Sequence, residues 1–139
     1  MSVNALCFDF GTKRIGVAFG SSLLGNGQPL KEIRARDGIP DWHELTTLIQ
    51  EYQPDVFVTG LPLNMDDSEN AMCQRARKFA RRLHGRFGKP SYVWDERLSS
   101  AEAKSLQPSD NYKRDAVDSL AAVMILQSWF SSGAPEQSA

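Results

Sequence analysis

The feature that most constrains the fold is a change of hydrophobic period near residue 41. Before this point, short apolar runs separated by turn residues predict strands over residues 5–10, 15–19 and 26–33. After it, helical spacing alternates with short apolar runs, which predicts helices over 41–52, 68–85 and 115–130 and strands over 56–58 and 92–94. Three antiparallel strands followed by helix-linked parallel strands indicate an α/β fold with a mixed five-stranded sheet flanked by helices.

Polar residues mark the expected starts of three helices. Asp41 is expected to cap the first. Asp66 followed by Glu69 resembles a capping box for the second, and Ser99 with Glu102 suggests another for a short third helix.

The composition is that of one globular domain. The 139 residues are 41% hydrophobic and 24% charged and contain no repeat, which predicts a single domain over residues 1–139, with about 131–139 as a disordered polar tail. No apolar run reaches the roughly 18 residues of a membrane span, and no secretory signal is recognisable, so a cytoplasmic protein without membrane contact is expected. Cys7 and Cys73 lack metal-ligand spacing and are expected to be buried free thiols.

Carboxylates stand at three places where the chain is otherwise apolar. Asp9 interrupts the first strand, where a buried carboxylate is costly unless it binds a cation or the donors of the following turn. Asp95 and Glu96 close the fifth strand, where capping and ligand binding are both open interpretations. Asp118 lies among apolar residues of the last helix, whereas the helix dipole accounts for Asp115.

Three of these acids form a candidate catalytic metal site: Asp9, Glu96 and Asp118. Their oxygens are the ligands that Mg²⁺ or Mn²⁺ prefers, and two such ions about 3.5–4 Å apart can activate water in phosphodiester hydrolysis. His43 and His84 are expected on the surface and lack zinc-ligand spacing with the cysteines.

Basic charge is segregated, although the net charge is -1. No acid lies between Glu69 and Asp95, a stretch that holds Arg75, Arg77, Lys78, Arg81, Arg82, Arg86 and Lys89. These residues form either a solvated helix face or a surface for several phosphates of a nucleic acid. The aromatic residues Phe10, Trp42 and Trp94 are expected in the core rather than as stacking platforms.

Five motifs, taken in order, resemble those of the YqgF/RuvX family. They are FDFGTKRIGVA at residues 8–18, GLPLNMD at 60–66, ARKFA at 76–80, DERLS at 95–99 and VDSLAA at 117–122. The resemblance spans about residues 5–130 and is therefore much more specific than any one motif.

This resemblance implies a ribonuclease-H-like fold, similar to Holliday junction resolvases, and a cytoplasmic metal-dependent nuclease that matures the 5′ end of 16S rRNA. The acidic positions of the family fall on Asp9, Glu96 and Asp118. Pre-rRNA is then the expected partner, branched DNA is the alternative, and the oligomeric state is left open. The residues expected to contact nucleic acid are Lys13, Arg14, Arg75, Arg77, Lys78, Arg81, Arg82 and Arg97.

The sequence departs from related proteins in two places, and two alternative functions remain open. Resolvases of this superfold carry an acid at the end of the fourth strand, where this chain has Gly60-Leu61-Pro62, and Glu96 is the candidate substitute. The stretch 104–114 is also shorter than the usual loop of the family. The Asp9–Thr12 turn resembles the ATP-phosphate turn of sugar kinases and actin-like ATPases, which need two such domains. The other rival is a non-catalytic module that binds ribosomal RNA or a transcription partner.

Overall fold

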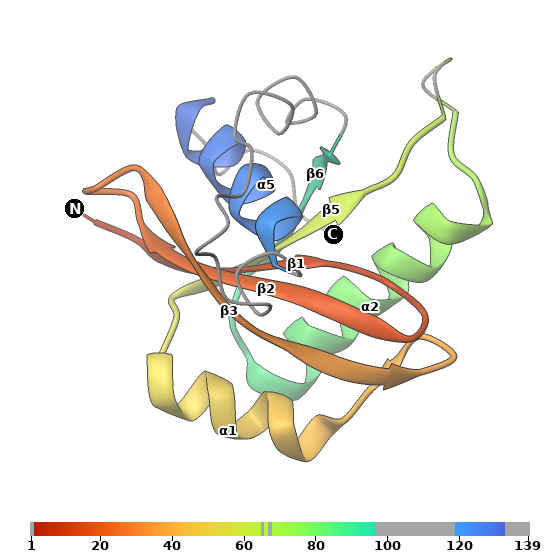
Figure 1. Ribbon diagram of the computed structural model, residues 1–139, viewed down its shortest axis with the longest axis horizontal. Coiled ribbons are helices and arrows are strands. Elements are labelled where there is room, and N and C mark those ends of the chain that lie inside the picture. The colour runs from red at the N-terminus through yellow and green to blue at the C-terminus, as the bar shows by residue number, and fades with distance from the viewer. Residues whose placement is uncertain (1, 65, 67, 97–118, 133–139) are drawn as a thin grey trace, which may run out of the picture.

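The computed structural model describes residues 2–64, 66, 68–96 and 119–132, and its central feature is a six-stranded mixed sheet (Figure 1). The strand order is β4-β3-β2-β1-β5-β6. Strands β1 (Asn4–Asp9), β2 (Arg14–Ser21) and β3 (Asn26–Arg36) are antiparallel, as predicted, while β5 (Val56–Leu61) and β6 (Ser91–Asp95) continue the sheet in parallel with β1. The carboxyl ends of these three parallel strands therefore meet at one edge of the sheet.

The sixth strand was missed in the sequence-based prediction. Strand β4 has two residues, Ile39–Pro40, and pairs with the end of β3, which runs three residues further than predicted. The connecting residues Asp37 and Gly38 have positive φ values of 51° and 81°, as two-residue hairpin turns require. A strand of two residues has no period to read, so only this Asp-Gly turn signals it.

Three described helices cover the two faces of the sheet (Figure 1). Helices α1 (Trp42–Tyr52) and α2 (Ala71–Phe87) pack on one face, against a core that includes Phe8 and Phe57. Helix α5 (Leu120–Ser131) covers the other face, against a core that includes Cys7. No helix in the described part of the chain has both the length and the hydropathy to cross a bilayer.

The starts of the helices test the capping predictions. Asp41 accepts bonds from two backbone N–H groups of α1, as predicted. The capping box predicted at Asp66 is wrong, because Asn70 caps α2 through a 2.9 Å bond from the Cys73 N–H group. Asp66 instead accepts bonds from the backbone and hydroxyl of Ser68. The short helix expected at Ser99, residues 115–118 of the last helix and the tail beyond 132 lie outside the described residues.

The cysteines and aromatic residues lie as expected. Cys7 and Cys73 are buried free thiols. Phe10, Trp42 and Trp94 are partly buried and pack against the core clusters.

Candidate active site

Two of the three predicted acids meet at the carboxyl edge of the parallel strands. Asp9 is the last residue of β1, and Glu96 directly follows β6. Strand β5 lies between these two strands, yet the two carboxyl groups share a hydrogen bond. Since alternate residues of a strand point to the same face, Asp9 lies on the α5 face together with Cys7.

A glycine in the intervening strand makes this contact possible. A Cβ atom on Gly60 would lie 3.1 Å from Oε2 of Glu96 and 2.6 Å from Cδ1 of Ile125. The Glu96 carboxyl group therefore lies over β5, beside the point where a side chain at residue 60 would begin. This is the strand that lacks the expected acid, and Glu96 reaches its surface from the neighbouring strand.

The electrostatics of this pair favour a bound cation. The pKa of Glu96 is raised from 4.5 to about 7. The causes, largest first, are burial, the charge of Asp9, the hydrogen bond to Asp9 and the charge of Asp95. Burial also raises the pKa of Asp9. Two neighbouring carboxylates repel each other unless a proton or a cation lies between them. Hard divalent cations are ligated by carboxylate oxygens, so these two residues fit such an ion.

The start of α5 is fixed to the same region of the sheet by Ser119, a residue that the sequence-based prediction missed. The β2–β3 ladder is irregular between Ile15 and Val17. The buried Ser119 hydroxyl accepts a 3.1 Å bond from the Val17 N–H group and donates a 2.5 Å bond to the Leu30 carbonyl, so it bridges this break. Val17 pairs with Phe8, which is next to Asp9. A serine inside an apolar helical segment was the available sequence signal.

The third predicted acid, Asp118, lies outside the described residues, as does Arg97. The part of the chain that is described has no group of three or more His, Cys, Asp or Glu side chains that could hold a metal. The next residue, Ser119, is held in place by its hydrogen bonds to Val17 and Leu30.

The turn after Asp9 carries two of the predicted phosphate contacts. Lys13 and Arg14 are exposed, and Arg14 lies 3.5 Å from a Glu32 carboxylate oxygen. A Cβ on Gly11 would be 2.4 Å from the Arg14 carbonyl oxygen, so this tight turn requires glycine. The backbone of Lys13 also accepts a bond from Ala35, which ties the turn to β3.

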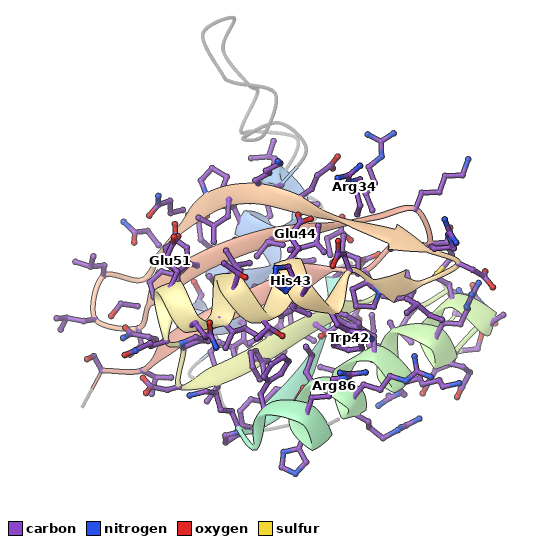
Figure 2. The ribbon with its side chains drawn as sticks, turned by 90° about the horizontal axis from the view of Figure 1, so that it is seen from below. Arg34, Trp42, His43, Glu44, Glu51 and Arg86 are labelled. Atoms are coloured by element: carbon purple, nitrogen blue, oxygen red, sulfur yellow. The ribbon has the colours of Figure 1, made fainter. Side chains whose placement is uncertain are left out.

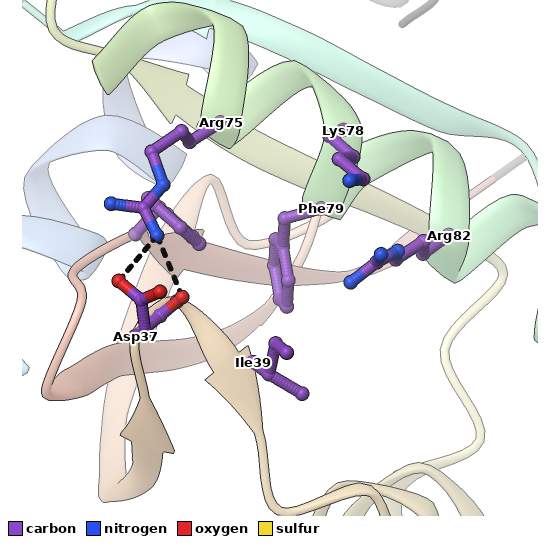
Figure 3. A pocket seen from close by; sticks show the side chains of 8 residues that line it. Asp37, Ile39, Arg75, Lys78, Phe79 and Arg82 are labelled. Atoms are coloured by element: carbon purple, nitrogen blue, oxygen red, sulfur yellow. Dashed lines mark hydrogen bonds and ion pairs between the residues drawn. The ribbon is translucent and has the colours of Figure 1, made fainter. Parts of the chain in front are cut away.

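The basic residues of α2 do not form one uniform surface. Acids outside the acid-free stretch pair with two of them: Asp37 with Arg75 at 2.7 Å and Glu69 with Arg77 at 2.9 Å. Arg81 is exposed, whereas Lys78 and Arg82 face a pocket beside Arg75 (Figure 3). The prediction from an acid-free stretch therefore overestimated the free positive charge of this helix.

The C-terminal end of α2 contacts α1. The Arg86 guanidinium lies 3.8 Å from the centre of the Trp42 ring, between α2 and α1 (Figure 2). His43 and His84 are exposed, as predicted.

Comparison with known structures defines the fold class. The structure of T. thermophilus RuvC in complex with Holliday junction substrate aligns with a TM-score of 0.65 at 9% identity, over 99% of both chains. A second structure, of Thermus thermophilus RuvC, aligns with a TM-score of 0.56 at 10% identity, over 98% of this chain and 99% of the other. The sheet topology and these alignments thus define a ribonuclease-H-like fold.

Comparison of sequences identifies the family. The family model described as "RuvX: Holliday junction resolvase" matches residues 3–132. A relative from Chromohalobacter salexigens is 54% identical over 90% of this chain and 87% of its own length, and one from Marinobacter nauticus is 55% identical over 89% and 90%. One from Escherichia coli is 50% identical over 96% and 99%. All three are named "Putative pre-16S rRNA nuclease". The chain belongs to the RuvX family.

Proposed function

We propose that this protein is a cytoplasmic, divalent-metal-dependent nuclease that processes the 5′ end of pre-16S rRNA. The observation that carries the proposal is the hydrogen-bonded pair of Asp9 and Glu96 at the carboxyl edge of a ribonuclease-H-like sheet. The names of these relatives support the substrate, since they are 50% to 55% identical to this chain over the aligned residues.

Asp9, Glu96 and Asp118 are the proposed ligands of Mg²⁺ or Mn²⁺. When bound, the metal supplies an activated water and stabilises the charge that develops on the phosphate. Asp9 offers its oxygens from a rigid strand end, and Gly60 leaves the space in which Glu96 reaches it. Ser119 fixes the chain next to Asp118 through two hydrogen bonds. Asp9 and Glu96 are thus far apart in sequence and meet only in the folded sheet.

Positive charge around this edge is proposed to bind the substrate backbone. Lys13 and Arg14 follow Asp9 in a tight turn, where they can contact phosphates near the bond to be cut. Arg97, Arg81 and the other basic residues of α2 are proposed as further contacts, weakened at Arg75 and Arg77 by their ion pairs.

A branched DNA substrate is the second candidate. It is favoured by the description of the matching family as a Holliday junction resolvase and by the fold shared with RuvC, which was solved on such a junction. The same catalytic acids would serve either substrate, because both contain phosphodiester bonds.

A cleavage assay separates these proposals. The protein is incubated with a pre-16S 5′ leader RNA, single-stranded DNA and a four-way DNA junction, with Mg²⁺, with Mn²⁺ and with chelator. Asp9→Asn, Glu96→Gln and Asp118→Asn should each abolish cleavage and leave binding largely intact, whereas Asp115→Asn should remain active. Residues that act as a unit are not additive, so the triple variant should be hardly worse than any single one. Full cleavage by Asp118→Asn would show that the three-acid site is wrong.

A further inference from the structure

A pocket on the other face of the sheet is distinct from the pair of acids. It has a volume of about 230 Å³ and lies between α2 and the β3–β4 hairpin (Figure 3). We call it the α2 pocket, and its lining residues are Phe10, Asp37, Gly38, Ile39, Arg75, Lys78, Phe79 and Arg82.

The β3–β4 hairpin forms one side of the α2 pocket and is held in place by several contacts. The Gly38 N–H group donates a 2.9 Å bond to the Thr12 carbonyl oxygen, and a Cβ at Gly38 would lie 2.9 Å from the Phe10 ring. Arg75 donates two 2.7 Å bonds to Asp37, one to its backbone carbonyl and one to its carboxylate. These contacts hold the hairpin against α2 and neutralise the acid at the rim of the pocket.

Two cations at the pocket remain available. Lys78 and Arg82 are four residues apart on α2, so their side chains are neighbours on one helix face. In the described part of the chain, neither forms an ion pair, in contrast to Arg75. Both side chains point into the space above Phe79 and Ile39 (Figure 3).

The rest of the lining combines the Asp37–Arg75 ion pair with three apolar side chains, Phe10, Ile39 and Phe79. Ile39 is 50% exposed, so part of this apolar surface faces solvent. Phe10 packs against Phe79 with ring centres 5.5 Å apart and completes the apolar side. Two cations beside an apolar surface suit a ligand with one phosphate and one apolar face, which is the chemistry of a nucleotide.

The position of the pocket relates it to the acids. Phe10 follows Asp9 directly, and consecutive side chains of an extended chain point to opposite faces. The α2 pocket and the acids therefore lie on opposite sides of the sheet near the end of the same strand. A single strand that passes around this edge can contact both.

We propose that the α2 pocket binds one unpaired nucleotide, with its phosphate between Lys78 and Arg82 and its base or sugar against Ile39 and Phe10. In the cell, this nucleotide would belong to a single-stranded segment of the substrate, an assignment that rests on the proposed nuclease function.

The test is a titration of the full chain by NMR without metal, with adenosine 5′-monophosphate and inorganic phosphate as probes. The monophosphate should shift the amide signals of Gly38 and Ile39 and bind more tightly than inorganic phosphate. The double variant Lys78→Gln/Arg82→Gln should lose about tenfold or more in affinity, since charged hydrogen bonds to phosphate are lost. The control Lys31→Gln/Lys89→Gln removes the same charge away from the pocket and should bind as the unchanged protein does.

A salt titration with a short single-stranded RNA adds a second readout. If Lys78 and Arg82 contact the same phosphate, their double variant should reduce the slope of log affinity against log salt by about 0.7. Equal losses in the pocket variant and the control would overturn the proposal, as would inorganic phosphate binding as tightly as the monophosphate. Binding is measured without cleavage, so an inactive protein that still binds the monophosphate refutes only the nuclease function. An active nuclease that fails to bind it refutes only the pocket.

Discussion

Replacing Glu96 by Gln should make the metal-free protein more stable at alkaline pH. In the folded chain, burial and the charge of Asp9 raise the pKa of Glu96 from 4.5 to about 7. Between these two values, the folded state binds a proton that the unfolded state has released, so stability falls as pH rises through this window. Gln has the same shape, can donate a hydrogen bond to Asp9 and does not titrate.

The size of the effect follows from the change in pKa. A difference of one in pKa corresponds to about 1.36 kcal/mol, so a rise from 4.5 to about 7 sets a ceiling of about 3 kcal/mol. Glu96 is only partly buried, and solvent screens its repulsion with Asp9, which reduces the expected effect to about 1–2 kcal/mol. The change should have begun at pH 5, just above the unfolded-state pKa of 4.5, and should be nearly complete at pH 8, above the folded-state pKa of about 7.

The assay is urea unfolding in the presence of chelator at several pH values between 5 and 8. The difference in unfolding free energy between Glu96→Gln and the unchanged protein should grow with pH by about 1–2 kcal/mol. Glu51→Gln changes an exposed glutamate of α1 and should show no such trend. Added Mn²⁺ should stabilise the unchanged protein at pH 8 and have much less effect on Glu96→Gln. A difference that does not depend on pH would refute the account of two acids in repulsive contact.

Three further substitutions test the supports of the site. Ser119→Ala should lower the unfolding free energy in urea by about 1–3 kcal/mol, because two backbone groups of the sheet lose their partner, and an unchanged midpoint would contradict this. Gly60→Ala should weaken Mn²⁺ binding in calorimetry, because the added carbon lies 3.1 Å from Oε2 of Glu96, whereas Gly85→Ala, with nothing within 4 Å, should bind normally. Thr59→Val should raise stability by about 1 kcal/mol, since the buried hydroxyl has no hydrogen-bond partner among the described residues, and a destabilised variant would reveal one.

The order of elements was predictable because each long segment has a single hydrophobic period. The short apolar runs of β1 and β2 and the helical stripe of α1 predicted their positions to within a few residues. The start of α2 was not predicted correctly. Several polar residues before it can cap a helix, and the spacing of Asp66 and Glu69 matches a capping box. In the structure, Asn70 lies nearest to the first turn and makes the bond, while Glu69 pairs with Arg77.

The candidate site was predictable only as a set of residue types. Asp9 is conspicuous because it interrupts an apolar run, and Glu96 because it ends one. Their contact depends on Gly60 in a third strand, which lies 36 residues from Glu96 in sequence and whose role is to leave space. The pairing of Arg75 with Asp37 depends in the same way on the β3–β4 hairpin, whose turn and second strand have only two residues each. Sequence patterns report what a segment prefers locally, and neither of these contacts is local.

The same hairpin also links the two faces of the sheet. The turn after Asp9 accepts one hydrogen bond from Gly38 and one from Ala35, so the hairpin holds this turn as well as α2. A ligand that moves Lys78 and Arg82 toward the hairpin would therefore contact the hairpin. The hairpin is hydrogen-bonded to the turn that contains Lys13 and Arg14. If substrate binds both at the acids and in the α2 pocket, the two contacts are coupled through this turn rather than through the sheet. Such coupling is reciprocal, so the monophosphate and Mn²⁺ should each change the affinity of the other by the same factor. Calorimetric titration of each ligand in the presence of the other measures this factor, and a factor of one would show that the two faces act independently.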